Sequence, residues 1–199
     1  MIQSLADDTT ERVWNREKAP RLGAEIQRAA QKKLRQLNAA DNINDLRTPP
    51  GNRLEKLVGN RVGQYSIPIN DQYRICFVWT KQGPAAVDHG LPLTRETLMS
   101  AKVHDPITPG EILLTEFLEP LGISQYRLAQ ATGLPQTRIS EIVHGRRRIT
   151  PGTGLRFSRA LGLSERYWIN MQTDYDIETE HDLHEEELRQ VEVLVSPAA

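Results

Sequence analysis

The spacing of apolar residues divides the chain into a first part of mixed pattern and a second part that is helical in pattern. In residues 21–40 the apolar side chains recur every three or four positions, at Leu22, Ile26, Ala29, Ala30, Leu34 and Leu37. This period predicts an amphipathic helix, and its opposite face is basic. Further on, QYSIPIN and YRICFVWT are typical of strands, and Asn70-Asp71-Gln72 between them predicts a tight turn. Helices followed by an antiparallel sheet predict an α+β unit with the helices packed on the sheet.

The pattern breaks between residues 82 and 106, where Gly, Pro and polar residues follow one another without a sustained period. An irregular stretch of this kind marks a domain boundary. The sequence therefore predicts two domains, residues 1–90 and residues 107–199, joined by a linker over residues 91–106.

Helix start and stop signals are dense after residue 107. Thr108, with Pro109 next and Glu111 three positions on, predicts a capping box, in which each side chain accepts from the other residue's backbone amide. Further starts fall at Ser124, Gln136, Thr150 and Ser164, and stops at Pro120, Gly133, Gly145 and Gly162. We therefore expect an all-α domain of five short helices. In the fifth helix Trp168, Met171 and Tyr175 share a face, which predicts core or dimer packing.

The stretch from Ser124 to Thr150 has the pattern of a helix-turn-helix. This motif needs a small residue where its helices cross, Gly in the turn, and apolar residues on the second helix facing the core. Ala129, Gly133, Ile139 and Ile142 supply these in order. Polar residues then face outward, and a basic loop follows. Such side chains bind base edges and phosphates, so we predict a DNA-binding surface of Gln125, Arg127, Gln136, Thr137, Arg138, Ser140, Arg146, Arg147 and Arg148. The alternative is a helical hairpin with a solvated basic loop.

Composition and charge fit two globular domains with different partners. The chain has 199 residues, of which 38% are apolar and 26% charged. Residues 1–90 hold 14 Lys and Arg and 10 Asp and Glu, whereas residues 91–199 hold 11 and 16. No apolar run approaches the roughly 20 residues of a membrane span, and the N-terminus lacks the pattern of a signal peptide. We expect a cytoplasmic protein with no membrane contact, in which the single Cys76 is a buried structural thiol.

Residues 105–180 contain the motifs PGEIL, EPLG, SQYRLA, RISEIVHGRR and, from Trp168 to Asp176, W-x-N-M-Q-x-x-Y-D. In these motifs the chain resembles the HigA antitoxin family, helix-turn-helix proteins related to the Cro and phage-repressor type. The resemblance implies a homodimer, formed through the C-terminal domain, that binds a palindromic operator. It places Gln136, Thr137, Arg138 and Ser140 at the recognition positions.

Residues 1–89, and above all LRTPPGNRLEKLVGNRVGQYSIPINDQYRICFVW, are similar to the HigB toxins of the RelE superfamily. The resemblance implies a RelE-like α+β domain that enters the ribosomal A site and cuts mRNA. That chemistry needs cations to hold phosphate and an acid/base pair for the 2′-hydroxyl and the leaving oxygen. On this basis Arg74 and His89 are the catalytic candidates. Arg53 and Arg61 are candidates for binding RNA phosphates, with a solvated surface cation as the alternative for each.

The N-terminal half departs from the toxin family at three points. Val58 stands where members often have Lys, Pro68 stands where they have Arg, and the terminal Tyr is missing from AAVDHG. Pro68 also removes a backbone donor, which predicts an edge strand there. Two main interpretations remain open: a DNA-binding autorepressor with a neutralised or inactive toxin domain, and a ribosome-dependent mRNA endonuclease held in check by its own antitoxin domain. In a third, the N-terminal domain serves only dimerisation.

A toxin and an antitoxin in one chain imply an intramolecular contact, because the linker raises their effective concentration. The complementary charges suggest a hypothesis for it. In this hypothesis, basic residues of the amphipathic helix predicted in residues 21–40, which would otherwise face RNA, meet the acidic tail over residues 174–187. The basic residues are Arg28, Lys32, Lys33 and Arg35. His181 and His184 in that tail are expected on a solvated charged helix rather than in a metal site, and no motif indicates a cofactor.

Overall fold

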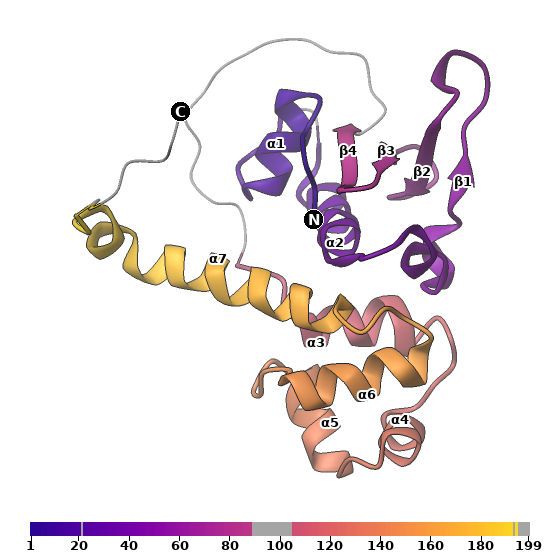
Figure 1. The fold of residues 1–199 in the computed structure, drawn as a ribbon, viewed down its shortest axis with the longest axis vertical. Coiled ribbons are helices and arrows are strands. Elements are labelled where there is room, and N and C mark those ends of the chain that lie inside the picture. Colours follow the sequence, from indigo (N-terminus) through magenta and orange to yellow (C-terminus); the bar gives the residue numbers. More distant parts are fainter. Residues whose placement is uncertain (21, 89–104, 193, 195–199) are drawn as a thin grey trace.

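The computed structural model describes residues 1–20, 22–88, 105–192 and 194 (Figure 1). The N-terminal part, up to residue 88, has the predicted α+β architecture. Its helices are α1 (Asp8–Trp14) and α2 (Ala24–Ala39), with 3-10 turns at Ile43–Arg47, Pro50–Asn52 and Gly59–Arg61. Its strands are β1 (Glu55–Lys56), β2 (Gln64–Pro68), β3 (Arg74–Thr80) and β4 (Gly83–Asp88). They form an antiparallel sheet in the order β1-β2-β3-β4.

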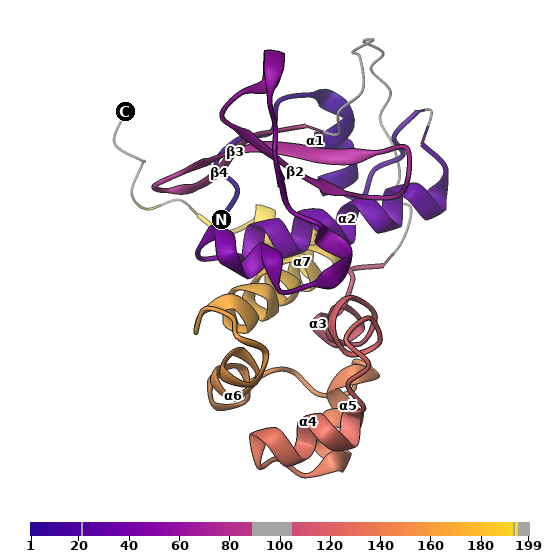
Figure 2. The same ribbon diagram turned by 90° about the vertical axis from the view of Figure 1, so that its right-hand side faces the viewer.

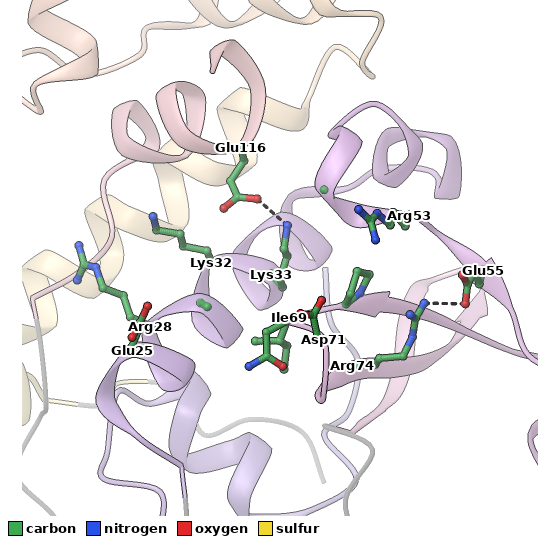
Figure 3. Close-up of a pocket in the computed structure, with 14 residues that line it drawn as sticks. Glu25, Arg28, Lys32, Lys33, Arg53, Glu55, Ile69, Asp71, Arg74 and Glu116 are labelled. Carbon is green, nitrogen blue, oxygen red and sulfur yellow. Dashed lines mark hydrogen bonds and ion pairs between the residues drawn. The ribbon is translucent and has the colours of Figure 1, made fainter. Parts of the chain in front are cut away.

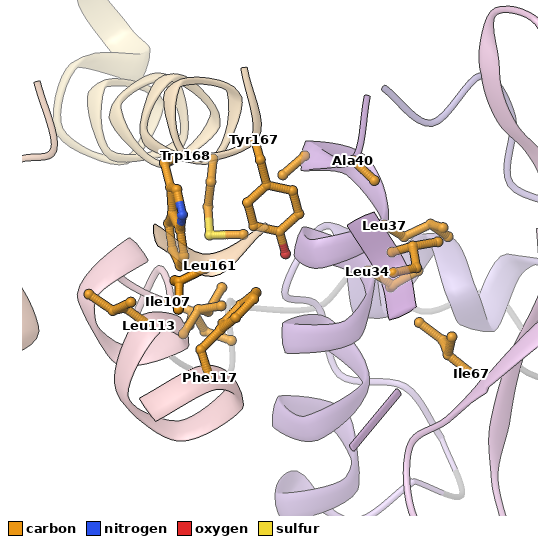
Figure 4. Packing of buried hydrophobic residues seen from close by; sticks show 14 of the residues in the cluster. Leu34, Leu37, Ala40, Ile67, Ile107, Leu113, Phe117, Leu161, Tyr167 and Trp168 are labelled. Carbon is orange, nitrogen blue, oxygen red and sulfur yellow. The ribbon is translucent and has the colours of Figure 1, made fainter. Parts of the chain in front are cut away.

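The predicted amphipathic helix is α2, whose apolar stripe packs on one face of the sheet. Leu34 and Leu37 are buried there beside Ile67 of β2 (Figure 4). Pro68 lies beyond the register of β1, which pairs with β2 only at Tyr65 and Ser66. The strand is therefore an edge at Pro68, as predicted, and the missing donor costs no ladder bond on that side.

The last strand and the N-terminus differ from the sequence pattern. The prediction of irregular structure from residue 82 is wrong for β4, which pairs with β3 immediately after the turn at Lys81 and Gln82. Gly83 takes a φ of +127°, which a residue with a side chain rarely adopts, and this lets the chain reverse there. The N-terminal residues then run parallel to β4, with a bridge between Leu5 and Val87.

The C-terminal part is helical, as predicted. Its elements are α3 (Pro109–Ile112), which continues into a π-helical segment (Leu113–Leu118), then α4 (Gln125–Thr132), α5 (Gln136–Val143), α6 (Pro151–Leu161) and α7 (Tyr167–Arg189). The predicted caps at Thr108 and Ser124 are confirmed, since their hydroxyls accept from the amides three residues on, at 3.0 and 3.1 Å. Gly133 and Gly162 end α4 and α6 in the left-handed conformation.

Two local predictions in this part need correction, and both concern groups that bind the N-terminal part. The carboxylate of Glu111 does not complete a capping box, because Arg28 and Lys32 of α2 bind it. The last helix begins at Tyr167 and not directly after Ser164. The Ser164 amide instead donates to Asp45 Oδ1 at 2.7 Å.

An aromatic cluster forms the core of the C-terminal part. The rings of Phe117 and Trp168 lie 5.2 Å apart between centroids, and Tyr167 and Phe157 pack edge-on against Trp168. Trp168 and Met171 are buried, as the predicted stripe requires, whereas Tyr175 is half-buried. The Tyr167 ring lies on the side of this cluster that faces α2, so the two cores adjoin (Figure 4).

Helix α2 is the central layer of the molecule. Figure 2 shows it between the sheet on one side and α3 and α7 on the other. Helix α2 thus packs its apolar face on the sheet of the N-terminal part and its polar face on the C-terminal part. Within the residues that the structure describes, no helix is both long and apolar enough to cross a membrane.

Candidate functional site

Helices α4 and α5 form the predicted helix-turn-helix. Ala129 is buried where α4 meets α5, and Ile139 and Ile142 of α5 are buried in the core. The turn is held from outside, because the guanidinium of Arg156 donates to the carbonyl of Thr132 at 2.6 Å. Short-range signals in the sequence, a cap, a glycine and two spaced isoleucines, predicted this motif, whereas the contact of Arg156 with the turn is long-range.

The predicted DNA-binding residues lie on three neighbouring segments of this motif. Gln136 and Thr137 are exposed at the N-terminus of α5, where the helix begins after Pro135, and Arg138 and Ser140 are half-buried on the same helix. Gln125 and Arg127 lie in the first turn of α4. The exposed basic loop of residues 146–148 follows α5. A shallow hollow joins helix and loop, and Thr137, Ser140, Glu141, Arg146 and Arg147 line it.

Two carboxylates hold the basic loop in place. Arg147 donates to Glu141 of α5 at 2.5 Å, and Arg148 donates to Asp176 of α7 at 2.5 Å. All four side chains are a third or more exposed, so water screens these pairs and a phosphate can compete with them. Asp176 is the last residue of the motif from Trp168, but its pairing with Arg148 could not be read from the pattern, because the two residues are 28 positions apart.

In the N-terminal part, Arg74 lies on β3 within a small polar network. Its Nε donates to Ser66 Oγ at 2.9 Å and its Nη2 to Glu55 at 2.8 Å. Arg61 donates to both carboxylate oxygens of Asp88 at 3.1 Å, and this hydrogen bond raises the pKa of Arg61. Arg74 and Arg61 are thus each paired with an acid, Glu55 and Asp88, that the sequence pattern did not indicate as part of the site.

Strand register explains why these groups share one face of the sheet. Glu55 lies opposite Ser66, Ser66 opposite Cys76, and Cys76 opposite Asp88. Cross-strand partners point to the same side, so a polar row runs across the sheet away from α2. Cys76 is buried in this row as the predicted structural thiol, and burial raises its pKa. The second catalytic candidate, His89, lies outside the described residues.

Arg53 lies in a cleft between α2, the segment of residues 51–55 and the β2–β3 turn, with a volume of about 590 Å³ (Figure 3). Five cations line it, Arg28, Lys32, Lys33, Arg53 and Arg74, together with the acids Glu25, Glu55, Asp71 and Glu116. The structure thus brings Arg53 and Arg74 to one cleft, whereas Arg61 is not among its lining residues. Glu116 comes from the C-terminal part.

The two parts meet along α2 through two groups of ion pairs. In the first, Arg28 and Lys32 bind Glu111, and Lys33 binds Glu116 at 2.6 Å. In the second, Glu178 binds both Arg16 and Arg35 at 2.6 Å, and Arg16 also binds Asp182. Asn38 and Asn170 add hydrogen bonds across the contact, to Asp174 and to the carbonyl of Ala39.

The hypothesis that the basic face of α2 meets the acidic tail is correct for Arg35 alone. Arg28, Lys32 and Lys33 meet acids of α3 and of the π-helical segment instead. Arg16 was missed, because a lone arginine after a short polar helix has no pattern that marks it.

Comparison with known proteins matches both parts. The family model of the "RelE-like toxin of type II toxin-antitoxin system HigB" matches residues 3–89, and a helix-turn-helix model matches residues 114–168. Toxin HigB-1 of Vibrio cholerae is 42% identical over 80 residues, which cover 40% of this chain and 84% of the toxin. Antitoxin HigA-1 of the same organism is 33% identical over 89 residues, 45% of this chain and 84% of the antitoxin.

Two further matches fall on the helix-turn-helix part. Virulence-associated protein I of Dichelobacter nodosus is 48% identical over 71 residues, which are 36% of this chain and 66% of that protein. The solved Pseudomonas aeruginosa antitoxin HigA with higBA promoter is 32% identical, with a TM-score of 0.43, over 45% of this chain and 99% of that one.

A HigB-like toxin part and a helix-turn-helix antitoxin part in one polypeptide define a toxin–antitoxin protein. The chain belongs to the HigB/HigA family of type II toxin–antitoxin proteins.

Proposed function

We propose that this chain is a self-neutralised toxin–antitoxin fusion that binds operator DNA and represses its own transcription. In this proposal residues 1–90 are a RelE-like toxin domain, residues 91–106 a linker, and residues 107–199 an antitoxin domain. The latter has five helices if α3 and the π-helical segment count as one. Two copies pair through the C-terminal domain on a palindromic operator.

The observation that carries DNA binding is the exposed surface of α5 and the loop after it. Gln136 and Thr137 are exposed in the first turn of α5, and the arginines of residues 146–148 flank them. Gln and Thr are suited to base edges, while the arginines are suited to phosphates. The contact between the two parts involves α2 on one side and α3, the π-helical segment and α7 on the other, so the DNA-binding surface remains accessible while the toxin part is bound.

DNA binding is tested with the full chain and the DNA upstream of its own coding sequence. We expect specific, salt-sensitive binding that Gln136→Ala combined with Thr137→Ala reduces to the level of unrelated DNA. Gln82→Ala, an exposed residue in the β3–β4 turn, serves as the control and keeps full affinity. Equal affinity for upstream and unrelated DNA in the unmodified chain would exclude the proposal.

An active endonuclease is the second candidate, and the network around Arg74 favours it. Arg74 remains paired with Glu55 and Ser66, and Arg61 with Asp88, so cations and acids are held together on one sheet face. Expression of residues 1–90 in bacteria, beside the full chain and an Arg74→Ala fragment, separates the two. Growth arrest by the fragment, relieved by Arg74→Ala and absent with the full chain, identifies a self-neutralised ribonuclease. If the fragment is folded but does not affect growth, the toxin domain is inactive and repression is the function that remains.

A further inference from the structure

We propose that the cleft beside α2 binds the phosphodiester backbone of a single-stranded nucleic acid, and that Glu116 of the antitoxin part occupies the position of one phosphate. This inference rests on the proposed function, under which the strand is RNA. The cleft is the one lined by Lys33, Arg53 and Arg74 (Figure 3). Its occupant in the described structure is a carboxylate, an anion of the kind a phosphate resembles.

The excess of cations in the cleft is smallest while the antitoxin part is bound. Five cations and four acids line it, and one of the four acids is Glu116. Removal of Glu116 leaves five cations against three acids. Arg28 and Lys32 also lose Glu111, to which both are bound at 2.7 and 3.0 Å. A surface with such an excess of cations attracts polyanions and releases their counterions.

Lys33 is the residue that most requires a replacement anion. Its side chain is 8% exposed, and its ammonium contacts Asn52 Oδ1 at 2.9 Å and Glu116 at 2.6 Å. A buried charge is costly without a partner. Gly51 lies beside it, where a Cβ would come within 3.6 Å of Nζ, so the chain offers an open approach at that point.

The arrangement of the cations fits an extended strand better than a small anion. Arg28 and Lys32 are one turn apart on α2, a rise of about 6 Å, which is comparable to the repeat of a nucleic-acid backbone. Arg53, which follows the 3-10 turn at Pro50–Asn52, and Arg74 of β3 line the rest of the cleft, and Arg74 joins the polar network of Ser66 and Glu55. A strand along these cations passes from α2 to the face that carries Arg74.

Binding to the cleft and docking of the antitoxin part are therefore mutually exclusive. The test uses the full chain with fluorescein-labelled oligouridylate and oligothymidylate of about 12 nucleotides. We expect weak binding by the unmodified chain and at least about tenfold tighter binding by the Glu111→Gln/Glu116→Gln variant. Adding Lys33→Met to that variant returns the affinity to the original level. Preference for the uridylate identifies RNA, while equal affinity identifies any single strand.

A matched control removes the same two charges elsewhere. Glu186 and Glu192 are exposed toward the C-terminal end of the described residues, and Glu186→Gln/Glu192→Gln should not tighten binding. An equal gain in this control, no gain in folded Glu111→Gln/Glu116→Gln, or a gain that survives Lys33→Met overturns the proposal. If the double variant does not fold, crosslinking of 4-thiouridine RNA to the unmodified chain decides. Crosslinks in residues 28–33 or 53 support the cleft, and crosslinks confined to other segments overturn it.

Duplex operator binding is measured with the same variants. It is expected to be unchanged, since neither Glu111 nor Glu116 lines the hollow between α5 and the basic loop. If the chain binds the operator but no variant binds the single-stranded oligonucleotides, the repressor function stands and the proposal for the cleft is overturned. If the oligonucleotides bind as expected and the operator does not, only the repressor function is overturned.

Discussion

Gly110 marks a position where the backbones of α3 and α5 are too close for any side chain. A Cβ at this residue would stand 1.8 Å from the carbonyl oxygen of Ile142. Gly110→Ala must therefore push the two elements apart, and we expect it to lower the free energy of unfolding by about 1–3 kcal/mol or more. Urea denaturation checks this.

Gly152 is a matched control for that substitution, since it is also near the start of a helix. A Cβ there meets nothing within 4 Å. Gly152→Ala should leave stability unchanged or raise it by up to about 1 kcal/mol. Similar effects of the two substitutions would contradict the close approach at Gly110.

Asp174 makes the stability of the interface depend on pH. Burial raises its pKa above the usual 3.8, against the opposing effects of the Asn38 hydrogen bond and of Arg35. Because the folded state holds this proton more tightly than the unfolded chain, the stability it contributes is complete below pH 3.8 and is lost as the pH rises through the folded-state pKa.

Asp174→Asn removes this titration while keeping an acceptor for Asn38. We expect the variant to gain stability relative to the unmodified protein as the pH rises from about 4 to about 7. Unfolding free energies across this range provide the measurement. A difference that stays constant would show that Asp174 ionises in the folded protein as it does in solvent, and one that falls with rising pH would show that folding lowers its pKa.

At the scale of single residues, local chemistry was predictable and long-range contact was not. Thr108, Ser124 and Gly133 act on neighbouring backbone groups, so the sequence alone indicates their conformation. The close approach at Gly110 and the burial of Asp174 depend on segments more than thirty residues away. No periodicity records such contacts.

Among the elements, α5 and the basic loop after it should contribute to DNA binding in different ways. Arg146→Ala removes a cation from the loop, and we expect it to weaken binding to all sequences alike and to reduce the salt slope by about 1. Gln136→Ala should instead cost about 1–3 kcal/mol on the operator and little on unrelated DNA. Salt titrations of both variants, on the operator and on unrelated DNA, measure the two effects. If Arg146→Ala weakened binding to the operator alone, Arg146 would contact bases and not phosphates.

The elements themselves followed from the sequence where their periods were long. Helix α2 has an apolar stripe over sixteen residues. Helix α4 begins at the Ser124 cap and ends at Gly133, and α6 begins at Pro151 and ends before Gly162. Strand β4 was missed, because Gly83 and Pro84 resemble a loop and the pairing partner β3 supplies the order. The capping box failed for a tertiary reason, since α2 binds the Glu111 carboxylate.

In the whole molecule, the sequence predicted that the two parts touch but not how. Complementary charges pointed to ion pairs between the basic residues of α2 and the acidic tail, yet of the four basic residues named only Arg35 makes such a pair, with Glu178. The other pairs depend on how α3, the π-helical segment and α7 pack against α2 and Arg16, which no local pattern encodes. The candidate site was affected likewise: Arg53 and Arg74 were found by resemblance, whereas Glu116, which enters their cleft, belongs to another part of the chain.

Glu178 is the acid on which the second group of ion pairs depends. It is 13% exposed and binds two buried guanidiniums, those of Arg16 and Arg35, while Arg35 also stacks on Trp14 at 4.2 Å. Burial lowers the pKa of Arg35, and Glu178 is the largest opposing influence. Removal of this carboxylate leaves two buried cations with less compensation, which is more costly than the loss of a surface pair.

We therefore expect Glu178→Ala to lower the free energy of unfolding by about 3–5 kcal/mol. Glu180→Ala, two residues away and 68% exposed, should change it by less than about 0.5 kcal/mol. Urea unfolding followed by tryptophan fluorescence reports on both parts, since Trp14 lies at the contact and Trp168 in the helical core. If Glu178→Ala behaves like the control, the two parts do not depend on this ion pair for stability, and the Glu111 and Glu116 pairs together with the hydrogen bonds across the contact are sufficient to hold them.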